Sequence, residues 1–513
     1  MEITKNYVYY EDFGAVGDGV TDDIAAIQAA HAYANEKRLP VKAKPGATYY
    51  IKNCTTPAVI MTNTDFTGAK FTIDDRGIER GSDRAGRIFT VAPEMPRFEI
   101  TDREVIGKIF GGYTLDRKNL KKINWKEGYP ALLVPRHHDS KKYIRYGNIS
   151  GNTGHMQREL ISIDKDGNVS PDTPLLFDYE DINSVLVMRT DDESITVMGG
   201  EFTTIANDVP QTSCFYISRG FGVKRSNATL KNIKHYVTGE LPGDTPETKG
   251  CSYSAFIFVE DCQDVTITDC TFTARKNYGL AGTYDLNVCQ ANRLTVKYCS
   301  QTNFYLEDGH TPSMLNFNYW GLAASNYSKN LTYDHCELSR FDAHEGVWNG
   351  KIKDSKISSV EIIGGGEMLI ENTTFVPFFP CLIMLRSDYG STWRGNLTIK
   401  NCHAIDDDRP LECLVRATYL NHYFGYTCYM PNVYIDNLTL RNPKRELEVI
   451  KIYNNGAPGE NVSLPVFSNG EENKNPYVPP REVKVTGDTE GIKYFVASDG
   501  FFENTDTFGV EKR

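Results

Sequence analysis

The sequence lacks several features that would assign it to a common class. No window of about 18 uninterrupted apolar residues is present, so neither a transmembrane helix nor membrane insertion is predicted. The opening residues 1–7 lack the basic and then apolar pattern of a signal peptide, so the chain is either made without one or has lost its leader. The localisation is therefore left open between the cytoplasm and export.

Basic residues and cysteines are also scarce. The chain has 56 Lys and Arg against 67 Asp and Glu, a formal net charge of −11, which argues against nucleic acid and anionic membrane as partners. Twelve cysteines in 513 residues, with no CxxC pair, are too dilute for a disulfide scaffold or a zinc site. Reduced, buried thiols are expected. No cofactor is predicted, and no clear acidic cluster supports calcium.

Apolar and aromatic residues are plentiful. Hydrophobic residues make up 40% of the chain, which is enough for a packed core and excludes wholesale disorder. Aromatic residues reach 12%, including 30 tyrosines, whose flat rings with a polar tip suit the binding of sugars. The composition therefore predicts a folded protein and is common where the partner is a polysaccharide, an oligosaccharide or another flat molecule.

A short phrase recurs along the chain: apolar, polar, apolar, two polar residues and often Cys. The clear copies are Val265–Cys270, Leu294–Cys299, Leu331–Cys336 and Leu397–Cys402, and the looser ones are Ile195–Gly200, Ala228–Ile233, Gly350–Ser355, Met368–Thr373 and Val433–Leu438. Alternation with period two predicts strands with one buried face. Copies 18 to 37 residues apart, with few helical patterns between them, predict an all-β, right-handed parallel β-helix.

The expected domain boundaries follow from the part of the chain in which this phrase recurs. The β-helix is predicted over residues 1–440, with an insertion or irregular coils at about 85–190, and residues 441–513 are expected to form a C-terminal cap or small β appendage. Within the insertion, Ile161–Val169 reads as a hairpin with an Asp-Gly turn. The histidines of this segment, His137, His138 and His155, are interpreted as part of a solvated loop rather than as metal ligands.

The N-terminal segment Tyr9–Ala30 begins as a Gly-rich turn and ends as a helix. Thr21 or Asp22 can cap this helix, which would cover the open end of the solenoid. Its phrase FGAVGDGVTDDIAAIQAA closely resembles the opening of the pectate lyase superfamily, which includes polygalacturonases, related β-helix enzymes and phage tailspikes. The resemblance implies the fold and a structural role for the aspartates, and leaves the reaction open.

Ser339–Gly346 is the densest group of ionisable residues. Asp342, His344 and Glu345 supply an acid, an imidazole and a second acid within four residues. Strand alternation places Asp342 beside His344, where the carboxylate is expected to orient the ring and raise its pKa. With Asp388 from a later coil, these residues are the predicted catalytic group.

Neighbouring coils carry residues suited to binding sugar. Aromatic rings stack on sugar faces, arginines bind carboxylates or hydroxyls, and acids can assist proton transfer. The predicted substrate-binding residues are Glu307, His310, Trp320, Arg340, Arg386, Tyr389 and Trp393.

The phrase Phe341–Glu345 also resembles the catalytic YGFDPHE segment of mannuronan C5-epimerases. The resemblance implies that Asp342 and His344 act at C5 of a uronate. The position of the epimerase tyrosine is Ser339 here, and that of the proline is Ala343. The NxD, DD, GHG and RIK motifs of polygalacturonases do not stand at the matching places.

Three functions follow from these residues. The favoured one is a glycoside hydrolase using paired carboxylates among Asp342, Glu345 and Asp388, because carboxylates outnumber suitable cations in these coils and the epimerase tyrosine is absent. The second is a polysaccharide lyase or uronate C5-epimerase that uses His344 with Arg and Tyr. The third is a non-catalytic glycan-binding or tailspike-type protein, which would be a trimer.

Overall fold

The computed structural model describes residues 6–147, 153–211, 215–273, 275–276, 278, 282–302, 319–320, 322–407, 410–420, 422–454, 477–478, 480–487, 492–498 and 510–512. The chain divides into two compact units, residues 1–97, 188–324 and 335–339, and residues 98–187, 325–334 and 340–513. Among the described residues, no helix has both the length and the apolar character needed to cross a membrane.

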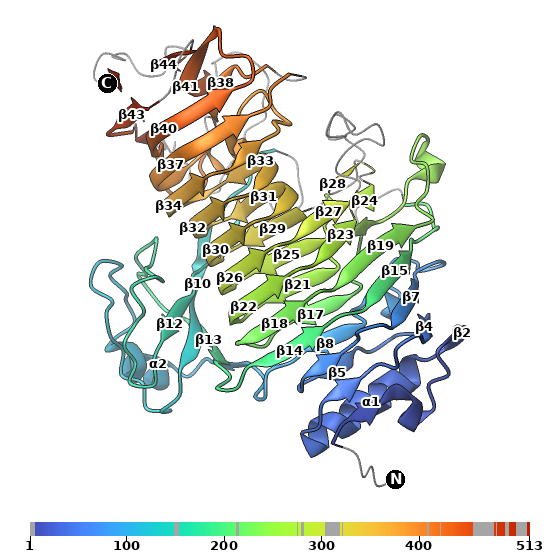
Figure 1. Ribbon diagram of the computed structural model, residues 1–513. Coiled ribbons are helices and arrows are strands. Elements are labelled where there is room, and N and C mark those ends of the chain that lie inside the picture. The colour runs from blue at the N-terminus through green and yellow to red at the C-terminus, as the bar shows by residue number, and fades with distance from the viewer. Residues whose placement is uncertain are drawn as a thin grey trace. The chain divides into compact units, whose positions relative to one another are not determined.

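The first unit is built from parallel strands that stack in three ladders, one for each face of a β-helix (Figure 1). One ladder contains β2 (Asp18–Asp22), β4 (Thr48–Ile51), β7 (Lys70–Asp74), β15 (Glu201–Ile205), β19 (Lys234–Thr238), β23 (Thr271–Thr273) and β27 (Ser300–Thr302). The second contains β1 (Val8–Tyr9), β3 (Val41–Lys42), β6 (Thr64–Asp65), β14 (Ile195–Met198), β18 (Ala228–Lys231), β22 (Gln263–Thr268) and β26 (Asn292–Lys297). The third contains β5 (Ala58–Ile60), β8 (Phe89–Val91), β17 (Phe221–Val223), β21 (Ile257–Glu260) and β25 (Leu286–Cys289).

The register of these ladders follows the sequence repeat. Ile195 pairs with Ala228, and Val265 pairs with Leu294, so equivalent apolar positions of successive copies stack inside the solenoid. The described cysteines are free, and Cys270 is buried at the end of its copy of the phrase. The predicted fold class is confirmed, because inward side chains repeat once per coil as the pattern requires.

The N-terminal helix α1 (Ile24–Lys37) packs against the first coils of this unit. Asp23 precedes it, and its carboxylate accepts hydrogen bonds from the backbone N–H groups of Val16 and Gly17 at 2.7 and 3.1 Å. The Asp18 carboxylate likewise accepts from the backbone of the turn that follows it. The aspartates of the N-terminal phrase therefore hold the turn that leads into the helix.

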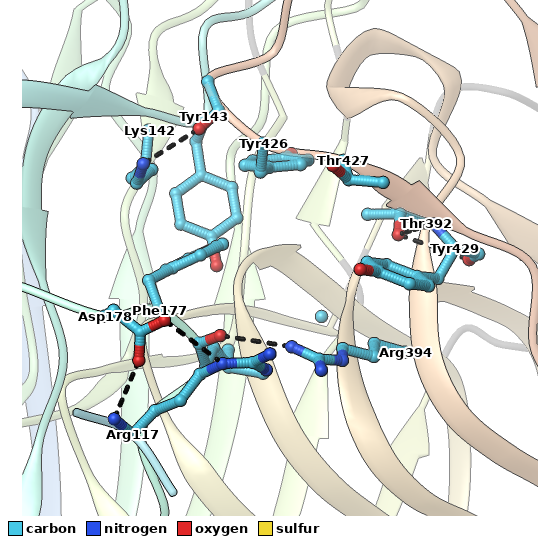
Figure 2. Close-up of a pocket in the computed structure, with 13 residues that line it drawn as sticks. Arg117, Lys142, Tyr143, Phe177, Asp178, Thr392, Arg394, Tyr426, Thr427 and Tyr429 are labelled. Carbon is cyan, nitrogen blue, oxygen red and sulfur yellow. Dashed lines mark hydrogen bonds and ion pairs between the residues drawn. The ribbon is translucent and has the colours of Figure 1, made fainter. Parts of the chain in front are cut away.

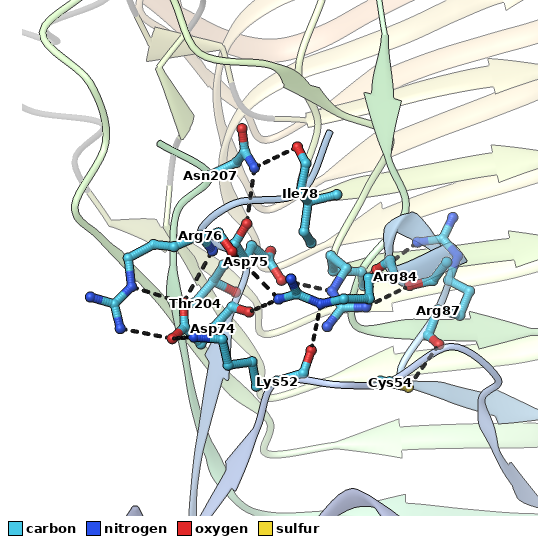
Figure 3. A network of polar contacts seen from close by, with 12 residues as sticks. Lys52, Cys54, Asp74, Asp75, Arg76, Ile78, Arg84, Arg87, Thr204 and Asn207 are labelled. Atoms are coloured by element: carbon cyan, nitrogen blue, oxygen red, sulfur yellow. Dashed lines mark hydrogen bonds and ion pairs between the residues drawn. The ribbon is translucent and has the colours of Figure 1, made fainter. Parts of the chain in front are cut away.

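Buried charges hold the turns of the first coils together (Figure 3). Arg219 Nε donates to Asp75 Oδ1 at 2.7 Å, and both side chains are fully buried. Asp74 Oδ2 accepts a hydrogen bond from Arg76 Nη2 at 2.7 Å, and Arg84 Nε donates to the carbonyl oxygen of Lys52 at 2.9 Å. A buried pair of this kind is costly to break, because the remaining charge has no water around it.

The second unit continues the same architecture with two long ladders. One contains β30 (Lys329–Asp334), β32 (Val347–Lys353), β34 (Gly364–Glu371), β37 (Trp393–Ala404), β40 (Asn432–Leu440), β43 (Val483–Thr486) and β45 (Val510–Lys512). The other contains β31 (Glu337–Glu345), β33 (Lys356–Ile362), β36 (Ile383–Leu385), β38 (Cys413–Tyr419), β41 (Arg445–Asn454) and β44 (Ile492–Ser498). Short strands complete the two units: β16 (Tyr216–Ile217), β20 (Ser252–Tyr253), β24 (Arg275–Lys276), β28 (Tyr319–Trp320), β29 (Leu322–Asn326), β35 (Thr374–Phe375), β39 (Cys428–Tyr429) and β42 (Tyr477–Val478).

Residues 98–187 of the second unit form an antiparallel module with its own hydrophobic core. Its elements are β9 (Phe98–Ile100), α2 (Arg103–Phe110), β10 (Ala131–Lys142), β11 (His155–Arg158), β12 (Ile161–Ile163) and β13 (Ser184–Arg189). Ile163 bridges Val169 in antiparallel fashion, so the predicted hairpin is confirmed. The C-terminal end of β10 brings polar and aromatic side chains to the solenoid coils of this unit.

Candidate functional site

Strand β31 carries three of the four predicted catalytic residues, Asp342, His344 and Glu345. Asp342 is fully buried there between two arginines, with Arg340 Nη2 2.7 Å from Oδ2 and Arg386 Nη1 3.1 Å from Oδ1. Burial raises the pKa of Asp342, but the charges of Arg340 and Arg386 outweigh it, and the net pKa is lowered. Asp342 is therefore an ionised carboxylate that is held in place from two sides.

Arg386 connects Asp342 to a second carboxylate nearer the surface. Its Nη2 donates to Asp388 Oδ2 at 2.9 Å, and Asp388 also accepts from Arg145 Nε at 2.8 Å. Burial raises the pKa of Asp388, but Arg386 and Arg145 lower it further than burial raises it. A third acid, Glu361 on β33, lies 3.7 Å from Arg386 Nη1. Carboxylates and guanidinium groups therefore alternate in this network.

His344 lies at the accessible edge of this network. Its Nδ1 is 3.9 Å from Asp342 Oδ2, and 20% of its side chain is exposed. Burial, together with the charge of Arg386, lowers the pKa of His344 to about 4 despite the opposite effect of Asp342. Asp342 acts on the pKa of this ring in the expected direction, but burial and Arg386 reverse the net shift. His344 is consequently neutral at pH 7 and can accept a proton.

Glu345, next to His344 in the sequence, belongs to a second group of polar contacts. Its Oε1 lies 3.1 Å from His155 Nε2 and accepts a hydrogen bond of 3.0 Å from Tyr389 Oη. Burial raises the pKa of Glu345, but the hydrogen bond and charge of His155 prevail and bring the pKa to about 2. His155 belongs to the antiparallel module, so its pairing with Glu345 shows that it does more than line a solvated loop.

The predicted substrate-binding residues fall into two sets, those that the structure shows to be buried and those whose side chains it does not describe. Arg340 and Tyr389 are buried beside the predicted catalytic group and contact it rather than solvent. Trp393 is also fully buried, and its indole N–H donates to the carbonyl oxygen of Gly366 at 3.1 Å, so no face of the ring is open for a sugar. Two predicted residues, Glu307 and His310, lie outside the described residues, and of Trp320 only the backbone in β28 is described.

A pocket of about 240 Å³ in the same unit was not predicted from the sequence (Figure 2). Its charged and aromatic lining consists of Arg117, Lys142, Tyr143, Phe177, Asp178, Arg394, Tyr426 and Tyr429. These residues come from β10, from two loops of the antiparallel module, and from β37 and β39 with the loop before it. No periodic signal marks such residues, because they belong to segments far apart in the sequence.

Tyr143 lies between the pocket and the predicted catalytic group. Its ring lies 5.2 Å from that of Tyr426 and 6.4 Å from that of Tyr389, in edge-to-face geometry. The hydroxyl of Tyr426 donates to the carbonyl oxygen of Tyr389 at 2.7 Å. Tyr143 itself has a left-handed backbone with φ 53°, which a bulky residue adopts only where its surroundings impose it.

Comparison with solved structures finds phage tailspikes of similar architecture. The tailspike gp61 of Pseudomonas phage phi297 aligns over 96% of this chain and 81% of its own, with 11% identity and a TM-score of 0.49. For tailspike gp49 from Pseudomonas phage LKA1 the coverages are 96% and 83%, the identity 12% and the TM-score 0.45. The Gp54 tailspike of Acinetobacter baumannii bacteriophage AP22, solved with a capsular saccharide, aligns over 95% and 76%, with 10% identity and a TM-score of 0.41.

Sequence comparison adds no relative to these structures. No protein-family model and no curated protein sequence matches the chain. The resemblances to the pectate lyase superfamily and to mannuronan C5-epimerases therefore rest on the quoted motifs alone.

Proposed function

We propose that the protein cleaves an acidic polysaccharide as a lyase, with His344 as the base that removes the proton from C5 of a uronate. The observation that carries the proposal is a neutral, partly exposed imidazole close to Asp342 and Glu345, two carboxylates whose pKa values are lowered. A neutral imidazole offers a free lone pair at pH 7, and with a pKa of about 4 it is a weak base until bound substrate raises that pKa.

The elimination needs a small number of groups. His344 takes the C5 proton, the electron pair forms the C4–C5 double bond, the C4–O4 bond breaks, and the leaving oxygen takes a proton from water. A bound uronate carboxylate would raise the pKa of His344 as any nearby negative charge does, which strengthens the base once substrate is present. Arg145, with 22% of its side chain exposed, is the cation nearest the surface that can offset the substrate charge.

Hydrolysis by paired carboxylates fits this geometry less well. A glycoside hydrolase needs one carboxyl group that holds a proton at working pH. Asp342, Glu345 and Asp388, the carboxylates predicted for this role, all have lowered pKa values, and each has a polar partner in Arg340, His155 or Arg145. Burial raises the pKa of Glu361, but this acid is buried between Arg340 and Arg386 and away from the exposed edge at His344. The hydrolase favoured by the sequence remains a prediction, and so does the trimer of the tailspike alternative.

The test is an assay of wild-type protein on polymers of galacturonate, mannuronate and glucuronate. Absorbance at 235 nm reports the unsaturated product, and a reducing-end assay reports cleavage of either kind. A rise at 235 nm that is lost in His344→Ala and kept in His335→Ala, an exposed histidine, supports the lyase. New reducing ends without absorbance would instead establish hydrolysis. Glycan binding without any product would reject both reactions and support a non-catalytic glycan-binding protein.

A further inference from the structure

The pocket of Figure 2 is positively charged within an acidic protein. Three cations line it, Arg117, Lys142 and Arg394, against the single carboxylate of Asp178. Lys142 Nζ donates to the carbonyl oxygen of Gly425 at 3.0 Å, and no carboxylate lies within ion-pair distance of Lys142 or Arg394 among the described residues. A neutral carbonyl satisfies a donor without neutralising its charge, and Glu159 and Glu180 act on Lys142 only from beyond ion-pair distance, so the pocket attracts an anion.

Two guanidinium groups converge at one end of the pocket. Figure 2 shows Arg117 and Arg394 pointing toward each other from opposite walls. Arg394 Nη1 donates to the carbonyl oxygen of Leu176 at 3.5 Å, and this is its one hydrogen bond within the part of the chain that the structure describes. Arg117 Nε lies 3.6 Å from Asp178, whose side chain is 60% exposed and thus a weak, water-screened partner. Paired guanidinium forks are suited to a planar carboxylate.

Aromatic faces lie beside these cations. The ring centre of Tyr429 is 5.0 Å from the guanidinium carbon of Arg394, and that of Phe177 is 5.1 Å from Lys142 Nζ. Phe177 also stacks on Tyr426, with ring centres 5.8 Å apart and an angle of 23°. Tyr429 and Phe177 are only partly buried, so a sugar ring can lie against them while its acid group reaches the arginines.

The wall that carries Leu176 and Phe177 is held by a buried acid. Glu159 accepts hydrogen bonds from the backbone N–H groups of Leu176 and Phe177 at 2.5 and 3.0 Å. Lys329 Nζ lies 3.8 Å from the same carboxylate, and both side chains are almost completely buried. A ligand therefore meets a wall whose position is already set, which reduces the ordering that binding requires.

We propose that this pocket is a subsite for one carboxylated sugar residue, bound through its carboxylate to Arg117 and Arg394 and through its ring to Tyr429 and Phe177. A volume of about 240 Å³ falls below the roughly 300–1,000 Å³ of sites for larger ligands, which fits a single ring. The inference deepens the proposed function by naming where the acidic polymer is held. Cleavage at His344 is a separate claim.

The experiment measures binding in the His344→Ala background, so that turnover does not interfere. Calorimetric titration uses tetrasaccharides of galacturonate, mannuronate and glucuronate, the same tetrasaccharides with their carboxylates reduced to alcohols, and a sulfated neutral tetrasaccharide. Arg394→Gln and Arg117→Gln remove one charge each. Arg441→Gln is the matched control, because this exposed arginine of the same unit pairs with Asp407 away from the pocket. Arg394→Lys keeps the charge but loses the fork, and a thermal melt checks each fold.

The expected result is binding of at least one acidic tetrasaccharide and none of its reduced form. Arg394→Gln and Arg117→Gln should weaken that binding at least tenfold, Arg394→Lys should weaken it less, and Arg441→Gln should leave it unchanged. Equal binding of reduced and acidic forms, unchanged affinity in Arg394→Gln, preference for the sulfated sugar, or no binding at all would each overturn the inference.

The two proposals fail in different assays. Loss of binding in Arg394→Gln without any 235 nm product from the wild type would retain the subsite and reject the lyase. A 235 nm product with binding unaffected by Arg394→Gln would retain the lyase and reject the subsite.

Discussion

His344 Nδ1 lies 3.9 Å from the carboxylate of Asp342 on the same strand, yet the pKa of this histidine is lowered to about 4. The carboxylate alone would raise it. Burial and the charge of Arg386 act in the opposite direction and prevail. Arg386 thus serves Asp342 and His344 at once, keeping the acid ionised and the imidazole neutral.

The stability of the protein should depend on His344 between pH 7 and pH 5. Unfolded His344 takes up a proton near its ordinary pKa of 6.5, whereas the folded form does so only near 4, so the free energy of unfolding falls as pH falls through this window. The loss expected by pH 5 is about 2 kcal/mol. Urea unfolding of wild type and His344→Gln at both pH values measures it.

His344→Gln should remove this share of the pH dependence, since glutamine does not titrate. His335→Gln, which changes an exposed histidine, should retain the wild-type difference between the two pH values. An identical pH dependence in wild type and His344→Gln would contradict the lowered pKa.

Asp342→Asn should abolish activity and destabilise the protein. The substitution leaves Arg340 and Arg386 buried with one of their three carboxylate partners neutralised, and such a change typically costs about 3–5 kcal/mol. Asp407→Asn is the control, because Asp407 is substantially exposed where it pairs with Arg441. Urea midpoints and the 235 nm assay report the two effects, and a midpoint equal to that of the control would show that the network is not important for folding.

Gly346→Ala should disturb the contact between Tyr143 and the turn that follows β31. Gly346 has φ 60°, and an added Cβ would overlap the hydroxyl of Tyr143, which is buried among other rings. Gly128 has a similar φ of 72° with open space around it, so Gly128→Ala carries the backbone strain without the overlap. Comparing the melting temperatures of the two variants isolates the overlap, and Gly346→Ala should melt clearly lower. Equal melting temperatures would mean that Tyr143 moves aside freely.

Asp75→Ala should destabilise the first unit, because it leaves Arg219 as an uncompensated charge in a fully buried position. The expected loss is about 3–5 kcal/mol. The exposed Asp83→Ala in the same unit should change stability by no more than about 0.5 kcal/mol. Limited proteolysis at increasing urea concentrations compares the two variants. If Asp75→Ala resists cleavage as well as Asp83→Ala does, the buried pair contributes little.

The amino-acid sequence by itself determined the solenoid. A strand with one buried face must repeat its apolar positions at every coil, so Val265 and Leu294 are aligned by their place in the repeat alone. The proximity of Asp342 and His344 also follows from sequence, because the two residues are separated by one position on a strand.

Only the tertiary structure decided the electrostatics and the pocket. The pKa of His344 depends on Arg386, and the pairing of Glu345 depends on His155, which belongs to another sheet. Arg117 and Arg394 meet because the antiparallel module and strand β37 belong to the same compact unit. Charge, burial and cavity shape arise from such distant contacts, and no local period in the sequence encodes them.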